Sequence, residues 1–257
     1  VLLVHTDTGT GITSDVAGVR AAMDAAKHPA LLLVDTIASL LTTDYRMDEW
    51  GVDVTIAAGQ KGLMLPPGLG FCGVNAKALA VADANRTPRN YWDWRERMDP
   101  NEFYKAFCGT APEHLMFGLR EALDMIAEEG EDAIFARHFR LSRSVHAAID
   151  CWAEGGALEN NAVIPEQRSN SVTTIRVDEK YNPMDIREIC RERFNTGLGN
   201  GMGKIINTSF RIGHMGDLNE PMIFGTIGAV EASLKLCGIP YGAGGVEAAI
   251  ASLTANG

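Results

Sequence analysis

Two ionisable side chains stand where apolar segments of the chain end. Asp35 closes the run ALLLVD, and Lys61 follows the run VTIAAG and one glutamine. Apolar residues and the rigid segment PPGLG come after Lys61, so we expect its amine to be held away from water. Desolvation favours the neutral form of an amine, which attacks carbonyl groups. The pattern therefore indicates an acid and a nucleophile at the ends of two strands.

Each of these residues also has an ordinary interpretation. An aspartate in this position commonly caps the turn that follows it, and most lysines lie on a solvated face. Asp35 and Lys61 lie 26 residues apart, at the ends of what we predict to be neighbouring strands. There the carboxylate could bind a heterocyclic nitrogen while the amine forms an imine. These are the two roles that pyridoxal phosphate requires of a protein.

The elements that position these residues fall into two halves. Residues 1–75 alternate continuous apolar runs with one helical stretch, SDVAGVRAAMDAAK. Strands of this kind are covered on both faces, which predicts an α/β fold with a mostly parallel sheet flanked by helices. Chemistry gathers in the loops after the strands' carboxyl ends. In this chain those loops are residues 5–11, 35–39 and 59–61.

Farther along, the periodicity predicts two long helices over residues 111–129 and 131–157, and then a strand, a helix, a strand and a helix. The break EEGED separates the two long helices. We therefore predict two domains, residues 1–130 and a smaller α+β domain over residues 131–257. The charged stretch around Trp92 and Trp94 is a candidate subunit interface.

The composition excludes several classes of protein. Among 257 residues, 33 are acidic and 23 are basic, and the resulting net charge of −10 has the wrong sign for binding nucleic acid. No apolar run approaches the roughly 18 to 20 residues that cross a bilayer. Five scattered cysteines indicate buried thiols in a reducing cytoplasm. No residues recur at metal-ligand spacing. We expect no nucleic-acid or membrane partner, no bound metal and a cytoplasmic location.

Four segments taken together resemble a known family. HTDTGTG, LLLVDTIASL, AAGQKGLMLPPGLGF and FRIGHMGDLNE look, in this order, like class V, fold-type I pyridoxal-phosphate aminotransferases of the serine–glyoxylate and alanine–glyoxylate branch. The resemblance extends over essentially the whole chain, and it makes residues 1–130 the C-terminal part of the large cofactor-binding domain. Because VLLVH looks like a strand already under way, we expect a fragment without the family's N-terminal third, which includes a Gly-rich phosphate loop.

The resemblance implies a role for each matching residue near the cofactor. Lys61 matches the Schiff-base lysine, which would also move the proton between the substrate Cα and the cofactor. Asp35 matches the partner of the pyridinium nitrogen, and Gln60 matches a residue near the cofactor phosphate. Thr8 matches a hydroxyl residue that contacts the ring oxygen of the cofactor, although it would otherwise be read as part of a turn after a strand.

Two further residues match positions in the family that bind substrate or join subunits. Arg211 matches the arginine that binds the substrate's α-carboxylate, and a planar guanidinium suits that task because it offers two parallel donors. Thr110 matches a residue that reaches the phosphate of a partner subunit, which implies a homodimer with shared sites. The family commonly has a tyrosine three residues before this threonine. Here Phe107 takes its place, so either Tyr104 substitutes for it or fewer groups hold the phosphate.

The implied activity is transfer of an amino group from serine, alanine or aspartate to a 2-oxo acid, with glyoxylate as the acceptor and glycine as the product. A nicotinamide-dependent oxidoreductase is a rival, since GTGITS precedes Asp35 by about the expected distance. However, Ser14 stands where the third glycine of that fingerprint belongs. A class V desulfurase would need a nucleophilic cysteine on a mobile loop, and none of the five is placed for it. A truncated chain that binds no cofactor is the non-enzymatic alternative.

Overall fold

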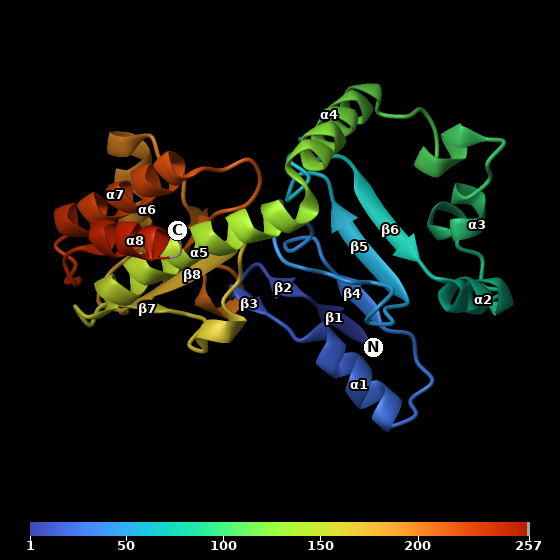
Figure 1. Cartoon of the computed structure of the whole chain (residues 1–257), viewed down its shortest axis with the longest axis horizontal. Helices are drawn as coiled ribbons and strands as arrows, with labels where there is room; N and C mark the ends of the chain where they lie inside the picture. The colour runs from blue at the N-terminus through green and yellow to red at the C-terminus, as the bar shows by residue number, and fades with distance from the viewer. Residues whose placement is uncertain (256–257) are drawn as a thin grey trace.

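Two sheets, one in each half of the chain, organise the molecule (Figure 1). The computed structural model describes residues 1–255. The first sheet has the strand order β1-β4-β5-β6, in which β1, β4 and β5 are parallel and β6 is antiparallel to β5. Its strands are β1 (Leu2–Val4), β4 (Leu33–Asp35), β5 (Val54–Ala58) and β6 (Gly70–Val74). The predicted mostly parallel sheet is confirmed.

The two faces of the first sheet differ in their cover. Helix α1 (Val16–Ala25) packs on one face, where Val34 belongs to a buried cluster with residues of the helix. Val4, Asp35 and Ile56 are register partners, so their side chains share the other face. Leu2, two residues before Val4, is 82% exposed. Part of this second face, at Leu2, is therefore open in the described residues.

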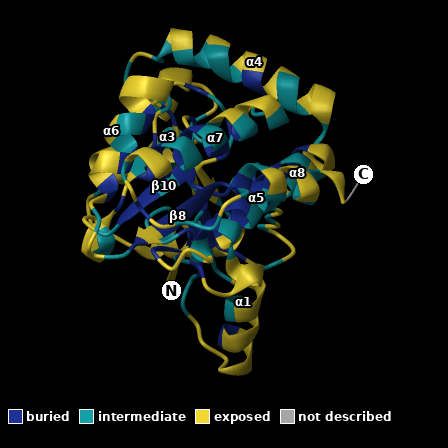
Figure 2. Ribbon diagram, turned by 90° about the vertical axis from the view of Figure 1, so that its left-hand side faces the viewer, coloured by how far each residue is buried: buried dark blue, intermediate teal, exposed yellow. Residues whose placement is uncertain are grey.

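The second sheet is antiparallel and forms the core of the second lobe. It runs in the order β7-β8-β10-β9, and helices pack around it so that β8, β10 and much of α5 are buried (Figure 2). Trp152, Phe210 and Ile175 are fully buried in this core. The strands are β7 (Leu158–Asn160), β8 (Val172–Val177), β9 (Gly199–Asn200) and β10 (Ser209–Gly213); the helices are α5 (Glu131–Ala153), α6 (Pro183–Phe194), α7 (Glu220–Leu236) and α8 (Gly245–Thr254).

Helices and short turns connect the two lobes. From β6 the chain passes through α2 (Ala76–Ala84), η1 (Asn90–Trp92), α3 (Trp94–Arg97) and η2 (Phe103–Phe107) to α4 (Glu113–Glu129) and α5. The two long helices are confirmed, and Gly130 separates them with a positive φ of 85°. The domain boundary at this glycine stays a prediction. Two further short helices, η3 (Pro165–Gln167) and η4 (Gly203–Ile205), lie in the second lobe. No helix in residues 1–255 is long and apolar enough to cross a membrane.

A small hairpin joins the first sheet to the second lobe. It consists of β2 (Thr6–Asp7) and β3 (Ile12–Thr13), whereas the sequence predicts a loop over residues 5–11. Three hydrogen bonds tie its turn to the other lobe: Thr174 Oγ1 donates to the Gly9 carbonyl at 2.9 Å, Asn161 Nδ2 to the Thr10 carbonyl at 2.9 Å, and the Ser169 amide to the Gly11 carbonyl at 3.0 Å. The segment that carries Thr8 is thus held between the two lobes.

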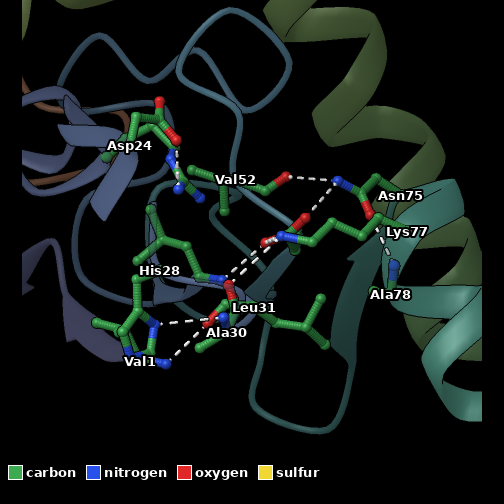
Figure 3. A network of polar contacts seen from close by, with 12 residues as sticks. Val1, Asp24, His28, Ala30, Leu31, Val52, Asn75, Lys77 and Ala78 are labelled. Carbon is green, nitrogen blue, oxygen red and sulfur yellow. Dashed lines mark hydrogen bonds and ion pairs between the residues drawn. The ribbon is translucent and has the colours of Figure 1, made fainter. Parts of the chain in front are cut away.

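A buried carboxylate aligns the amino ends of the strands. Asp53, which is 2% exposed, accepts hydrogen bonds from the Leu32 amide at 2.8 Å and from Asn75 Nδ2 at 2.9 Å. Burial opposes its ionisation, but these bonds and the nearby Lys77 amine hold its pKa below the usual range. Asn75 also accepts from the Ala78 amide and so caps α2 (Figure 3). The network fixes β4, β5 and α2 relative to one another. Because the two strands are fixed, their carboxyl ends at the opposite edge of the sheet are positioned as well.

Candidate active site

A cleft of about 610 Å³ lies between the hairpin, the first sheet and the second lobe. This volume falls in the range of small-molecule sites. The wall of the cleft consists of Val4, Asp35, Ile37, Ala38, Asn161, residues 6–10 and residues 202–205. The first sheet contributes the carboxyl ends of β1 and β4, which is the edge where the sequence predicts chemistry.

Asp35 is on the cleft wall at the last position of β4. Its Oδ1 accepts a hydrogen bond from the Ile37 amide at 2.8 Å, which closes a tight turn. Its Oδ2 has no hydrogen-bond partner among the described residues. One oxygen thus caps the turn, which is the ordinary role expected of an aspartate here. The other oxygen remains available to a ligand in the cleft.

Lys61 lies in the turn after β5, the strand that pairs with β4. Its side chain is half-buried, and it forms no hydrogen bond or ion pair with another described residue. The next residue, Gly62, packs so closely on the chain that follows Asp35 that an added Cβ would lie 2.0 Å from the Leu40 carbonyl oxygen. The turns after β4 and β5 are therefore in direct contact, although Lys61 is not among the residues that line the cleft.

Arg211 and Thr8 come from different lobes and meet beside the cleft. Arg211, on β10, donates from Nη1 to the Thr8 carbonyl at 3.0 Å and from Nε to the Asn200 carbonyl at 2.5 Å. Burial lowers the pKa of its guanidinium, and the nearby Arg187 adds to the shift. Its Nη2 has no partner among the described residues, so part of the guanidinium is free to bind an anion.

Of the predicted site residues, only Asp35 and Thr8 line the cleft in the described chain; Lys61 and Arg211 lie in neighbouring elements, and Gln60 and Thr110 are not brought to it. Gln60 is exposed, and Thr110 is exposed in the segment before α4. That segment lies on the far side of β6 from the hairpin (Figure 1). The hydroxyl of Tyr104 donates to Glu102 at 3.0 Å, while Phe107 packs on Phe103 with ring centroids 5.4 Å apart. The roles of Gln60 and Thr110 stay predictions.

Sequence reasoning missed several residues of the site. Lys204 and Asn161 reach the cleft wall from the second lobe, and Asp7 supports the hairpin by accepting from the Thr10 amide and hydroxyl, each at 2.7 Å. The segment HTDTGTG contains a signal for Asp7, because Asp side chains commonly bond nearby backbone amides in turns. No local pattern marked Lys204 or Asn161. Within residues 1–255 no cluster of His, Cys, Asp and Glu is arranged to hold a metal.

Comparison with known sequences identifies relatives over nearly the whole chain. Residues 1–205 match the family described as Aminotransferase class-V. An L-aspartate–glyoxylate aminotransferase of Paracoccus denitrificans is 41% identical over 250 residues, covering 97% of this chain and 62% of that protein. A serine–glyoxylate aminotransferase of Arabidopsis thaliana is 40% identical over 253 residues, covering 97% of this chain and 61% of that protein. The chain spans about three fifths of the length of these relatives.

Solved structures agree with the sequence matches. The crystal structure of a pyridoxamine–pyruvate aminotransferase from Mesorhizobium loti superimposes with a TM-score of 0.86 at 26% identity, over 100% of this chain and 65% of its own. An alanine–glyoxylate aminotransferase from Nostoc gives a TM-score of 0.79 at 28% identity, over 91% of this chain and 61% of its own. With the fold, the ordered motifs and the family match in agreement, this chain belongs to the class-V aminotransferases.

Proposed function

We propose that this protein is a pyridoxal-phosphate-dependent aminotransferase that moves an amino group from an amino acid to a 2-oxo acid, with glyoxylate as the acceptor and glycine as the product. One observation carries the proposal. Asp35 and Lys61 follow adjacent parallel strands, and the turns that hold them are in contact. Class V aminotransferases of this branch depend on pyridoxal phosphate.

Asp35 on the cleft wall and Lys61 in the adjoining turn fit this cofactor. Asp35 offers an unpaired carboxylate oxygen on the wall, and Lys61 offers an amine without a competing partner. When bound, pyridoxal phosphate supplies a carbonyl carbon that carries the amino group and a ring that takes up negative charge. A carboxylate at the ring nitrogen keeps that nitrogen protonated, which is the role of Asp35 in this proposal.

The remaining roles follow from the chemistry of each side chain. The Lys61 amine would take the proton from the substrate Cα and deliver it to the cofactor carbon C4′, because a neutral amine acts as a base and, once protonated, as an acid. Arg211 binds the α-carboxylate through the free side of its guanidinium and so orients Cα toward Lys61. The Thr8 hydroxyl would contact the cofactor's ring oxygen, Gln60 would lie near the cofactor phosphate, and Thr110 would reach the phosphate bound to the partner subunit.

The amino donor is serine, alanine or aspartate. The relatives named above act, by name, on serine or aspartate with glyoxylate. Aspartate needs a cation for its distal carboxylate. Lys204 lies on the cleft wall and forms no ion pair with another described residue, so the cleft offers such a cation. Serine and alanine need none.

The decisive variant is Lys61→Ala in the full chain. Borohydride should fix the cofactor covalently to the wild-type chain at Lys61 and to none of the Lys61→Ala chains, which should also lose transamination. Lys235→Ala, which changes an exposed lysine on α7, should behave like wild type. Serine, alanine and aspartate are then tested one at a time for conversion of the bound aldehyde to the amine form, followed by absorbance. Reduction onto another residue in the Lys61→Ala chain would overturn the proposal.

The rival activities have less support. A desulfurase needs a reactive cysteine at the site, and none of the cysteines lines the cleft in the described chain. A nicotinamide-dependent activity gives Lys61 no role. This alternative also disagrees with the family match.

We also infer a homodimer and a cytoplasmic location. The segment 91–107 exposes Tyr91, Trp92, Phe103 and Tyr104, which we call the aromatic segment. Exposed apolar patches of this kind mark protein interfaces. A second copy that covers it would bring Thr110, a few residues farther on, toward the neighbouring site. All five thiols are free, as in a reducing compartment, but the prediction of buried thiols is wrong for Cys72 and Cys108, which are exposed.

A further inference from the structure

The side chain of Arg137 bridges the junction of α4 and α5. Glu129 is the last residue of α4, and Gly130 separates it from α5, which carries Arg137. Arg137 donates from Nε and Nη2 to the two carboxylate oxygens of Glu129, at 2.6 and 2.8 Å. Its Nη1 donates to the carbonyls of Gly216 and Leu218, at 2.8 and 3.2 Å. The guanidinium thus joins both helices to the segment between β10 and α7.

These bonds connect the two lobes. Figure 1 shows α4 beside the first sheet and α5 running into the second lobe. Leu115 and Ile126 of α4 pack in one cluster with Leu63. Leu63 lies two residues after Lys61, so α4 is attached to the Lys61 turn. Helix α5, by contrast, is part of the core of the second lobe through Leu141. The ion pair at the junction therefore joins the Lys61 turn to the lobe that carries β10.

The pair of Arg137 and Glu129 differs from an ordinary surface ion pair. Exposed pairs contribute little, because water screens them and their side chains are mobile. Here Arg137 binds both carboxylate oxygens, and its side chain is only 18% exposed. The bonds from Arg137 hold the pKa of Glu129 below its usual range, so the pair is ionised at neutral pH. A bidentate pair fixes direction as well as distance, which is what setting the angle between two helices requires.

Packing alone does not fix the angle at this junction. A cavity of about 340 Å³ lies beside it, and its wall includes Met64 from the Lys61 turn, Ile126 from α4 and Ile134 from α5. Well-packed interiors contain few voids larger than a water molecule. On this side of the molecule, the bonds of Arg137 therefore provide much of the restraint between the lobes.

The segment between β10 and α7 leads directly back to Arg211. Gly216 lies five residues after Arg211, and its amide donates to His138 Nε2 on α5 at 3.0 Å. Between them His214 is fully buried, and both of its ring nitrogens have hydrogen-bond partners. The chain from Arg211 to Gly216 is therefore well fixed, so a displacement of Gly216 is passed on to Arg211.

We propose that Arg137 is a positioning residue for substrate binding. By restraining the angle between α4 and α5, it sets the place of Arg211 relative to the Lys61 turn. This inference rests on the proposed function, in which Arg211 binds the α-carboxylate of the substrate. Without the Arg137 bonds the second lobe adopts several angles, and only the fraction of chains with Arg211 in place binds the donor. The apparent affinity falls by that fraction, whereas saturating donor restores the arrangement.

The test compares Arg137→Gln with Arg140→Gln in the full chain, saturated with cofactor. Arg140 also lies on α5 and forms an ion pair, but its partner Glu220 belongs to the same lobe. The donor is whichever of serine, alanine and aspartate the wild-type chain uses. In Arg137→Gln its KM should rise at least about fivefold while kcat changes less than about twofold. Arg140→Gln should leave KM unchanged, because a purely structural loss lowers the amount of active enzyme and not its affinity.

Hydrogen exchange of the same chains gives a readout that does not depend on activity. The amides of residues 214–218 should exchange at least about tenfold faster in Arg137→Gln than in wild type or Arg140→Gln, since the bonds that hold this segment are gone. Glu129→Gln weakens the pair from the other helix and should raise KM as well. Combined with Arg137→Gln, it should add nothing further, because both changes remove the same interaction.

The outcomes separate this inference from the proposed function. An unchanged KM in Arg137→Gln, an equal rise of KM in Arg140→Gln, or a rise without faster exchange of residues 214–218 overturns the positioning role. Should Arg137→Gln not fold, Glu129→Gln decides by the KM criterion. A wild-type chain that transaminates none of the three donors refutes the proposed function itself, and the positioning role falls with it.

Discussion

Single residues in this protein serve two purposes at once. Asp35 was open to two interpretations from sequence, a turn cap or a group that binds a ligand. The structure assigns the first to Oδ1, which accepts from Ile37, and leaves Oδ2 free at the cleft wall. The two interpretations are therefore compatible. Arg211 is similar, because it joins the lobes through Thr8 and Asn200 while keeping one side of its guanidinium free.

Replacing Arg211 by lysine tests whether the free side of the Arg211 guanidinium binds the substrate carboxylate. Lysine keeps the charge but loses the fork that matches a carboxylate. We expect KM for the amino donor to rise about tenfold to hundredfold, which corresponds to the roughly 1.5 to 3 kcal/mol of a hydrogen bond to a charged group. The rise in KM should exceed any fall in kcat. Steady-state kinetics provide the measurement. Arg176→Lys, on the neighbouring strand β8, should change neither constant, and an unaltered KM in Arg211→Lys would remove Arg211 from substrate binding.

At the scale of elements, the strand ends were predictable and the hairpin was not. Continuous apolar runs ending in Asp35 and before Lys61 indicate the strands and their polar exits, because burial dictates that pattern. The hairpin β2–β3 has only two residues in each strand, and its partners lie more than 150 residues away on the second lobe. A local pattern contains no information about such contacts. For the same reason Lys204 and Asn161 could not be assigned to the site.

The Lys61 turn gives a prediction at this scale. In Gly62→Ala the new Cβ would overlap the Leu40 carbonyl, which is main chain and cannot rotate away. We expect the free energy of unfolding to fall by about 3 kcal/mol, near the upper end for overpacking, and kcat to fall because the turn that holds Lys61 shifts. Denaturant unfolding and activity assays measure the two effects. Gly225→Ala, an exposed helical glycine with open space around it, should be neutral or slightly stabilising. Equal stability of the two variants would refute the argument.

For the whole molecule, the proposed dimer depends on the aromatic segment. Trp92→Glu places a charge on a side chain that is 75% exposed in the single chain. If a second copy buries it, dissociation should become easier by about 30-fold, the effect of losing roughly 2 kcal/mol at a central interface residue. Analytical ultracentrifugation measures the change. Because Thr110 would then leave the partner's site, the cofactor should also dissociate more readily.

Val163→Glu is the control for the dimer, since Val163 is equally exposed but lies in the second lobe. Its dissociation constant should match that of wild type. A Trp92→Glu chain that sediments as wild type does would place the subunit contact elsewhere.

The hairpin between the lobes also constrains how the protein can move. Main-chain carbonyls of Gly9, Thr10 and Gly11 are bonded to the second lobe, and Arg211 is bonded to Thr8. If the second lobe rotates about the junction of α4 and α5, the hairpin turn travels with it and the Asp35 edge stays behind. Such a rotation would move Thr8 and Arg211 together toward Asp35. Binding of the substrate by Arg211 and closure of the pocket would then occur in one motion.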